Sequence, residues 1–355
     1  MNDQDHSELL QQRVRAAARD STPLNITGGG SKAGYGRRPD PAHATLELTP
    51  HRGVIAYEPT ELVVTARAGT PLAEIERLLD AERQQLAFEP PDFNGNATIG
   101  GLVAAGLSGP RRPFAGAVRD AVLGVTLLNG QGQILRFGGQ VMKNVAGYDV
   151  ARLQCGALGT LGVLLEVSLK LQPKPAMELT LSFELDHAAA QRRFIEWSRL
   201  PWSITATASD GTRACVRLAG VESAVNAARV ALGGEPLADA DDFWLRLKNH
   251  SLPFFAGDKP LWRLSLPPDA PSLEHEGPEL HEWNGALRWL RCDAAPADAH
   301  EIARRLGGHA CLFGGDTVGD PFQPLPPAML ALHRRLKHAF DPRGILNPGR
   351  LYAEL

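Results

Sequence analysis

Residues 96–110 read NATIGGLVAAGLSGP, and small side chains occupy most positions of this stretch. Pro90 and Pro91 precede it, and Ser108-Gly109-Pro110 ends it abruptly. Where a chain packs flat against another surface, bulky side chains are excluded and glycine permits close approach. We therefore interpret the stretch as a loop held against a ligand. Close packing of a helix is the alternative interpretation, and the abrupt stop at Pro110 counts against it.

A second glycine-rich loop, Gly28-Gly29-Gly30-Ser31-Lys32, follows a predicted strand at 23–27. Glycines let successive backbone N–H groups converge on an anion, and Lys32 adds a positive charge. A plain turn between strand and loop is an equally good interpretation of the triple glycine alone. The spacing also fits the dinucleotide pattern G-x-G-x-x-A, but Gly34, Gly36, Pro39 and Pro41 follow. These residues cannot sustain the helix that a Rossmann loop opens, so we reject that fold.

A third segment of small residues runs from Lys143 to Asp149 (KNVAGYD) and continues with CGALGTLGV at 155–163. Its small residues precede a predicted strand. Taken singly, Lys143 or Tyr148 would be interpreted as a surface residue. The three segments together are far more specific than any one of them.

The two halves of the chain differ in composition, which indicates two domains. Of the 36 glycines, 22 precede residue 174, whereas all six tryptophans follow residue 190. A chain of 355 residues also exceeds the size at which one hydrophobic core stops growing. Two closely spaced prolines in Gln172-Pro-Lys-Pro175 favour an extended connector. We expect domains at 1–173 and 176–326, with a helical C-terminal segment at 327–355.

Hydrophobic periodicity predicts an α+β fold in both regions. Asn129-Gly130 lies between two predicted strands of the first region and favours a hairpin turn. In the second region, strands and helices alternate in a way that suits an antiparallel sheet with helices on one face. The strands are expected at 23–27, 45–48, 62–67, 122–128, 134–137, 163–171, 178–183, 213–218, 262–266 and 285–290. The helices are expected at 7–18, 71–82, 188–197, 222–232, 297–306 and 327–339.

Composition and charge exclude several classes of protein. The formal net charge of −3 gives no electrostatic reason to expect a nucleic-acid partner. The polar N-terminus MNDQDHSELL does not resemble a secretory signal, and no apolar run reaches the length of a membrane span. Four scattered cysteines without a CxxC pair support neither a zinc site nor an iron–sulfur cluster, and they fit a reducing cytoplasm.

The glycine-rich segments together resemble the FAD-binding domain of the vanillyl-alcohol oxidase and p-cresol methylhydroxylase superfamily. Within it, the resemblance is strongest to the smaller flavin subunits of bacterial glycolate oxidases. It covers almost the whole chain, although 176–280 is uninformative. It implies a p-cresol methylhydroxylase-type FAD-binding domain and a second α+β domain, with 327–355 returning to the first. The segments that carry it are GGGSK (28–32), ATIGGLVAAGLSGPRRP (97–113), VRDAVLGV (118–125), GGQVMKNVAGYDVARL (138–153), GTLGVLLEV (159–167), WNGALRWL (283–290) and FDPRGILNPGRLY (340–352).

The resemblance implies FAD as the cofactor and suggests where it binds. Gly28–Lys32 and Ala97–Gly101 should hold phosphate through backbone amides, and the residues around Ser108 should flank the same ligand. Tyr148 should lie near the flavin, and Val163 should meet it through its backbone. The expected cofactor-binding residues are Gly28, Gly29, Gly30, Ser31, Lys32, Pro90, Pro91, Ala97, Thr98, Ile99, Gly100, Gly101, Gly106, Ser108, Gly109, Gly147, Tyr148 and Val163.

Two departures from the superfamily pattern carry predictions. Members with covalent FAD usually have a histidine in or just after the first loop, where this chain has Ser31 and Lys32, so non-covalent FAD is expected. The larger flavin subunits carry a metal-binding histidine pair, but this chain has no H-x-H arrangement. His275 and His281 have no obvious metal-site spacing and are interpreted as surface residues. No metal is expected.

The resemblance implies a subunit of a complex that oxidises glycolate to glyoxylate and passes electrons to an iron–sulfur partner. We expect the larger flavin subunit to oxidise the substrate and this chain to supply a second flavin. A self-sufficient dehydrogenase for another hydroxy acid or alcohol, and a scaffold subunit with structural FAD, are the alternatives. No catalytic base is evident, and Arg288 is the candidate for a residue facing the flavin. The expected location is the cytoplasm, with attachment to the inner membrane only through partners.

Overall fold

The computed structural model describes residues 3–93, 95–139, 148–273, 275, 277–313 and 320–355. The chain divides into two compact units. Unit 1 comprises residues 1–108, 117–173 and 324–355, and unit 2 comprises residues 109–116 and 174–323. The short segment Gly109–Gly116 thus belongs to unit 2, although the sequence suggested a place in the first domain. None of the described helices is long and apolar enough to cross a membrane.

Unit 1 is built on an antiparallel sheet in the order β3 (Val54–Glu58), β4 (Val63–Arg67), β8 (Val163–Lys170), β6 (Val122–Leu128) and β7 (Ile134–Gly138). Every residue of β4 is buried, as expected for an inner strand with both faces covered. β6 and β7 form the predicted hairpin, in which Leu128 pairs with Ile134 across the Asn129 turn. A second, parallel pair joins β1 (Leu24–Thr27) to β2 (Ala44–Glu47).

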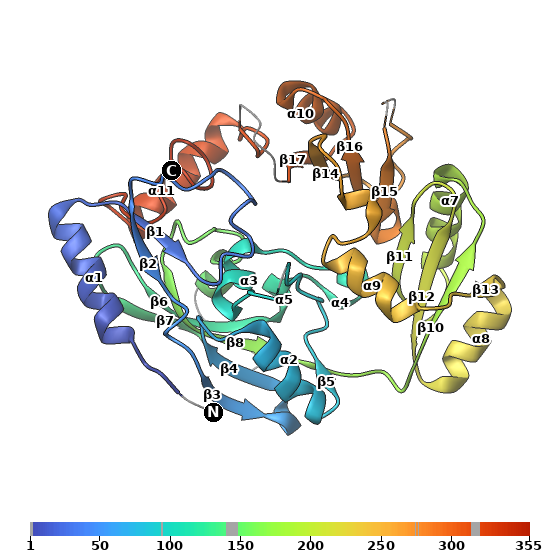
Figure 1. The fold of residues 1–355 in the computed structure, drawn as a ribbon, viewed down its shortest axis with the longest axis horizontal. Coiled ribbons are helices and arrows are strands. Elements are labelled where there is room, and N and C mark those ends of the chain that lie inside the picture. The colour runs from blue at the N-terminus through green and yellow to red at the C-terminus, as the bar shows by residue number, and fades with distance from the viewer. Residues whose placement is uncertain (1–2, 94, 140–147, 274, 276, 314–319) are drawn as a thin grey trace. The chain divides into compact units, whose positions relative to one another are not determined.

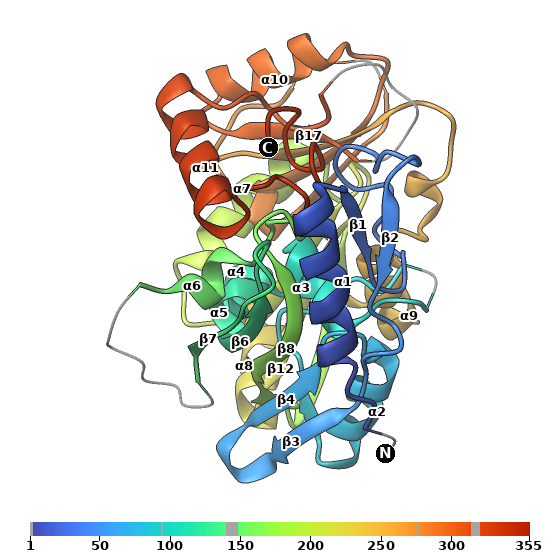
Figure 2. The ribbon, with the colours of Figure 1, turned by 90° about the vertical axis from the view of Figure 1, so that its left-hand side faces the viewer.

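The first helix of unit 1 buries one apolar face in the core. α1 (Ser7–Asp20) buries Leu10, Val14 and Ala17, which recur at helical spacing. It lies beside β1 and β2 (Figure 1 and Figure 2), and Arg13 donates a hydrogen bond to the carbonyl of Thr45. The remaining helices are α2 (Leu72–Ala81), α3 (Ile99–Ala105), α5 (Val118–Ala121), α6 (Val150–Leu153) and α11 (Pro327–Phe340). Short strands β5 (Gln84–Gln85) and β9 (Gln172–Pro173) form a further pair.

The glycine-rich stretch at 96–110 contains helix α3, where a loop was expected. Thr98 caps this helix by accepting a hydrogen bond from the amide of Gly101 at 3.2 Å. A Cβ on Gly100 would lie 2.6 Å from the Cβ of Ala68 on the neighbouring segment. Glycine is therefore needed there for close helix packing, which is the interpretation that the sequence had disfavoured.

Unit 2 holds an eight-stranded antiparallel sheet and confirms the predicted α+β class. Its order is β13 (Glu235–Pro236), β10 (Met177–Phe183), β12 (Ala214–Gly220), β11 (Ile204–Ser209), β15 (Glu279–Glu282), β16 (Leu287–Arg291), β14 (Leu261–Ser265) and β17 (His309–Leu312). A one-turn helix, α4 (Arg112–Ala115), belongs to this unit, as do the 3-10 turns η2 (Pro253–Phe255) and η3 (Trp283–Gly285). A third such turn, η1 (Pro59–Glu61), belongs to unit 1.

Alternation along the strands separates two faces of this sheet. Val216 packs with Phe194 of α7 (His187–Ser198) and Val225 of α8 (Glu222–Leu232). Further along the sheet, apolar side chains of β14 and β16 pack with α10 (Pro296–Arg305). The adjacent residue Cys215 points to the other face, where α9 (Ala240–Lys248) packs. Helices thus cover both faces, and not one face as predicted (Figure 1).

Candidate functional site

The candidate site is a cavity of about 300 Å³ within unit 1, at the carboxyl end of β1. Most of its wall comes from the glycine loop after β1, from one side of α3, and from the C-terminal residues Asn347 and Arg350. A smaller and more apolar cavity of about 70 Å³ shares several of these residues and continues between Leu48, Ala68 and Leu164. A polar compartment therefore adjoins an apolar one.

The glycines of the first loop are needed because two chain segments cross closely. A Cβ on Gly28 would lie 2.4 Å from Oγ1 of Thr98, and a Cβ on Gly29 would lie 1.5 Å from the carbonyl oxygen of Asn96. Gly30 has φ of +73°, which L-residues rarely adopt. The amides of residues 29–32 donate to no acceptor within the described chain. Such exposed N–H groups next to a cavity form a site for an anion.

Replacing Gly29 by alanine is expected to push the loop away from Asn96, because the new methyl group would overlap a backbone oxygen. Overpacking of this kind typically costs about 1–3 kcal/mol. We expect roughly 10-fold weaker flavin binding, measured by fluorescence titration of the flavin-free protein. Gly34→Ala is the matched control, because a Cβ there meets nothing within 4 Å. Equal losses in both variants would contradict this explanation.

Two cationic side chains face the polar compartment. Burial lowers the pKa of Lys32 to about 8, and the carboxylate of Asp92 partly offsets this effect. Burial also lowers the pKa of Arg350 to about 10. Arg350 is only 8% exposed, and its Nη2 donates to the carbonyls of Lys32 at 3.3 Å and Ala33 at 3.0 Å. Its Nη1 is buried without a hydrogen-bond partner among the described residues. A buried guanidinium nitrogen without a partner is costly, so the site fits an anionic ligand.

Asn347 holds the parts of the wall together. Its Oδ1 accepts a hydrogen bond from the amide of Ile26 at 2.6 Å, and its Nδ2 donates to the carbonyl of Leu158 at 2.7 Å. It adopts φ of +43°, a conformation that asparagine tolerates better than most residues. Asn347 and Arg350 belong to the C-terminal motif NPGR, but sequence reasoning gave neither of them a role. Their polar side chains in a proline- and glycine-rich tail were the available signal.

Comparisons with known proteins agree with this geometry. Residues 5–138 match the family described as FAD binding domain, and residues 324–351 match the C-terminal domain of FAD linked oxidases. The glycolate oxidase subunit GlcE of Escherichia coli (strain K12) is 47% identical over 351 residues, which cover 99% of each chain. The chain belongs to the GlcE family of FAD-linked oxidases. The glycolate oxidase subunit GlcD of Bacillus subtilis (strain 168) is 32% identical over 173 residues, or 48% of this chain and 36% of that protein.

The fold is also that of solved flavoprotein structures. p-Cresol methylhydroxylase with substrate bound superimposes with a TM-score of 0.73 at 13% identity, covering 98% of this chain and 87% of the other. At that identity the likeness shows the fold alone. Together with the GlcE family match, it confirms the predicted p-cresol methylhydroxylase-type fold and FAD as the cofactor.

The cavity brings together only part of the residues that the GlcE family resemblance suggested. The predicted residues that do line its two compartments are Gly28, Gly29, Gly30, Ser31, Lys32, Thr98, Gly100 and Gly101. Gly147 lies outside the described residues. Tyr148 is 98% exposed and does not line either compartment. The other predicted residues that line neither compartment are Pro90, Pro91, Ala97, Ile99, Gly106, Ser108, Gly109 and Val163.

The structure corrects the expected role of the amides in Ala97–Gly101. The amide of Ala97 donates to Asp92, that of Ile99 donates to the carbonyl of Thr70, and that of Gly100 donates to the carbonyl of Ala68. The amide of Gly101 is occupied by its own helix cap. The amides of Ile99 and Gly100 anchor α3 to the turn after β4, so these four N–H groups already have acceptors within the chain. The amides of the first loop and Nη1 of Arg350 have no acceptor among the described residues.

Arg288 and His281 also differ from expectation. Arg288 is fully buried in unit 2, and its guanidinium donates to the carbonyls of Gly285, Ala270 and Pro271 at 3.2, 2.5 and 2.6 Å. These bonds fix a loop against β16, so we assign Arg288 a structural role instead of a flavin-facing one. His281, which was expected on the surface, is only 3% exposed.

Proposed function

We propose that this chain is the FAD-binding subunit of a glycolate oxidase complex. The observation that carries the proposal is the anion-ready cavity of unit 1, whose backbone amides and buried Arg350 match what a dinucleotide diphosphate needs. The identity of 47% to the glycolate oxidase subunit GlcE, over 99% of each chain, supports glycolate oxidase as the complex. We accordingly assign FAD binding to unit 1, including its C-terminal segment, and a substrate-side or partner-side role to unit 2.

Within unit 1 we propose that Gly29–Lys32 donate backbone hydrogen bonds to the diphosphate, and that Lys32 and Arg350 balance its charge. The apolar compartment beside Leu48 and Leu164 would exclude water from the ring system. Bound FAD supplies an acceptor for a hydride from the hydroxy-acid carbon and a donor of single electrons. The residues of this chain bind and orient that group.

The larger flavin subunits of the superfamily carry a metal-binding histidine pair, whereas the sequence of this chain has no H-x-H arrangement. We therefore propose that a larger flavin subunit, related to GlcD, oxidises glycolate. This chain then contributes a second flavin for assembly or electron relay, and electrons continue to an iron–sulfur subunit. We place the complex in the cytoplasm, with contact to the inner membrane only through partners.

The purified chain, mixed with glycolate without oxygen, tests the proposal through its visible spectrum. A flavin spectrum that glycolate does not bleach would support a flavin subunit without its own substrate site. Prompt bleaching would mean that the chain is a self-sufficient dehydrogenase. If glycolate alone does not bleach the flavin, adding the larger flavin subunit together with glycolate should reduce both flavins. A chain that never binds flavin, alone or in the complex, would overturn the proposal.

Denaturation should release the flavin completely. Neither compartment is lined by a histidine, and Ser31 and Lys32 stand where covalent members of the superfamily usually carry one. Precipitation with acid followed by absorption measurement of both fractions checks this prediction. Yellow colour in the protein pellet would contradict it.

A further inference from the structure

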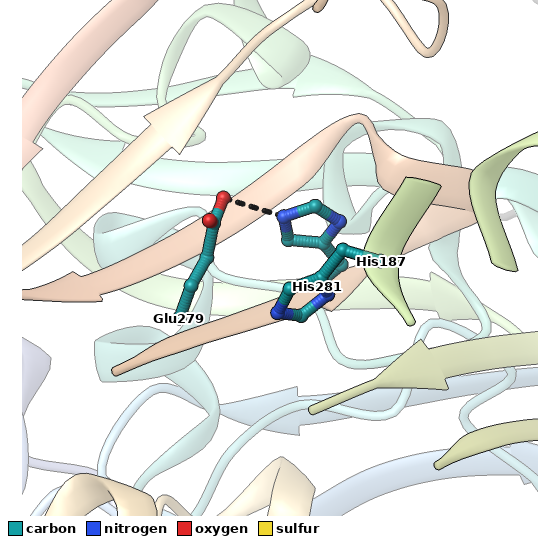
Figure 3. A group of neighbouring side chains, drawn as sticks. All are labelled: His187, Glu279 and His281. Carbon is teal, nitrogen blue, oxygen red and sulfur yellow. Dashed lines mark hydrogen bonds and ion pairs between the residues drawn. The ribbon is translucent and has the colours of Figure 1, made fainter. Parts of the chain in front are cut away.

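Unit 2 contains a cluster of side chains that are typical metal ligands. His187 is the first residue of α7, and Glu279 and His281 lie two residues apart on β15. One nitrogen or oxygen atom from each of the three lies within 4.8 Å of the others. Figure 3 shows the carboxylate of Glu279 and the two imidazole rings turned toward one another. The cluster belongs entirely to unit 2, so the cavity of unit 1 contributes nothing to it.

Strand geometry explains why Glu279 and His281 share a side. Residues two apart on a strand point to the same face, and the pairing of His281 with Arg288 fixes that face. It is the face on which α7 packs, opposite to Trp289 and α9. His187 enters from the first turn of α7, and its ring stacks on that of His281 with centroids 4.1 Å apart.

The surrounding residues hold the cluster in place. Nε2 of His281 lies 2.5 Å from Oε1 of Glu279, and His275 lies 3.3 Å from the other carboxylate oxygen. The Oγ of Ser209 lies 3.3 Å from Nδ1 of His187. A Cβ on Gly211 would lie 2.9 Å from Nε2 of His187, so glycine leaves room for the ring. Ligating groups that are themselves hydrogen-bonded are typical of metal sites, because such partners orient the ligands.

We propose that His187, Glu279 and His281 bind one divalent transition-metal ion of the Zn²⁺ class. Two imidazoles and one carboxylate are a ligand set that zinc uses, whereas calcium and magnesium prefer oxygen ligands alone. In a tetrahedral zinc site with bonds of about 2.0–2.2 Å, neighbouring ligand atoms lie roughly 3.3 Å apart. Binding of the ion would widen the 2.5 Å contact between His281 and Glu279 and turn the His187 ring out of its stack on His281. The ion would tie the beginning of α7 to β15 and leave its fourth position to water.

Zinc binding to the full chain, first stripped with a chelator, tests the proposal. Isothermal titration with Zn²⁺ should give one site, and loading should raise the melting temperature. His187→Gln and Glu279→Gln should each weaken Zn²⁺ binding by more than the roughly 10- to 100-fold that loss of an outer partner costs. His338→Gln, which changes an exposed histidine of α11, is the matched control and should bind as tightly as the unchanged chain.

X-ray absorption of the zinc-loaded, unchanged chain identifies the zinc ligands directly. Because no substitution is involved, misfolding of a variant cannot affect the result. Two imidazole nitrogens and two oxygens, one from the carboxylate and one from water, in the first shell would support the proposal. Absence of stoichiometric binding, a different ligand set, or undiminished binding in both His187→Gln and Glu279→Gln would overturn it. The flavin spectrum of each variant reports separately on unit 1, so this site can fail without affecting the proposed function.

Discussion

Exchange of both Lys32 and Arg350 for methionine should nearly abolish FAD binding. Each substitution would remove a charge-assisted hydrogen bond that we propose to the diphosphate, and such bonds contribute about 1.5–3 kcal/mol. If the two losses add, roughly 3–6 kcal/mol is lost, which corresponds to roughly 10²–10⁴-fold weaker binding. Flavin fluorescence titration of the flavin-free protein measures this loss. Methionine keeps the apolar stem that packs in the wall, so the fold of unit 1 should persist.

Arg335→Met is the matched control for this pair, because Arg335 is exposed on α11 and does not line the cavity. It should bind FAD like the unchanged chain. A double variant that still binds FAD with unchanged affinity would show that the diphosphate lies elsewhere. A control that loses affinity equally would show that the overall charge of the chain matters more than the cavity.

The pH dependence of binding follows from Lys32. In the flavin-free chain its pKa is about 8, lowered by burial, so the side chain is charged below that pH and loses its proton above it. A bound diphosphate favours the charged form and raises this pKa, so binding above about pH 8 takes up a proton. FAD affinity should therefore fall from about pH 8 upward, by at most about 10-fold per pH unit. Lys32→Met should remove this slope.

Replacing Lys337 by methionine should strongly destabilise unit 1. Its Nζ donates to Oδ2 of Asp341 at 2.7 Å and to the carbonyls of Thr160 and Leu346 at 2.8 and 2.7 Å. Both charged residues are buried. Removing one partner of a buried ion pair leaves the other charge without compensation, at a cost of about 3–5 kcal/mol. Urea unfolding followed by circular dichroism measures the change.

A second substitution separates the charge effect from lost packing. In Lys337→Met/Asp341→Asn no charge remains buried, so this double variant should be more stable than Lys337→Met alone. Arg335→Met, on the exposed side of the same helix, should change the free energy of unfolding by less than about 0.5 kcal/mol. If the double variant were the less stable one, the ion pair would not be the reason for the loss.

The sequence by itself determined the class of protein and the part of the candidate site that the glycine loop at 28–32 forms. Glycine is informative locally, because only glycine fits where Gly28 and Gly29 approach Thr98 and Asn96. The apolar patterns of Ser7–Asp20 and Val122–Leu128 likewise made this helix and this strand predictable. The prediction of a loop was wrong at Ile99–Ala105, where small residues allow a helix to pack closely against Ala68. The amides of Ile99 and Gly100 donate hydrogen bonds to the neighbouring turn.

Only the tertiary structure decided which distant groups meet. Arg350 bonds to the carbonyl of Lys32 across 318 positions of the chain, because the C-terminal segment returns to β1. His187 reaches Glu279 and His281 because α7 packs on the face that the register of β15 and β16 selects. The local sequence indicates which groups a side chain can bind. Strand register and the return of the C-terminal segment to β1 decide which side chains lie next to each other.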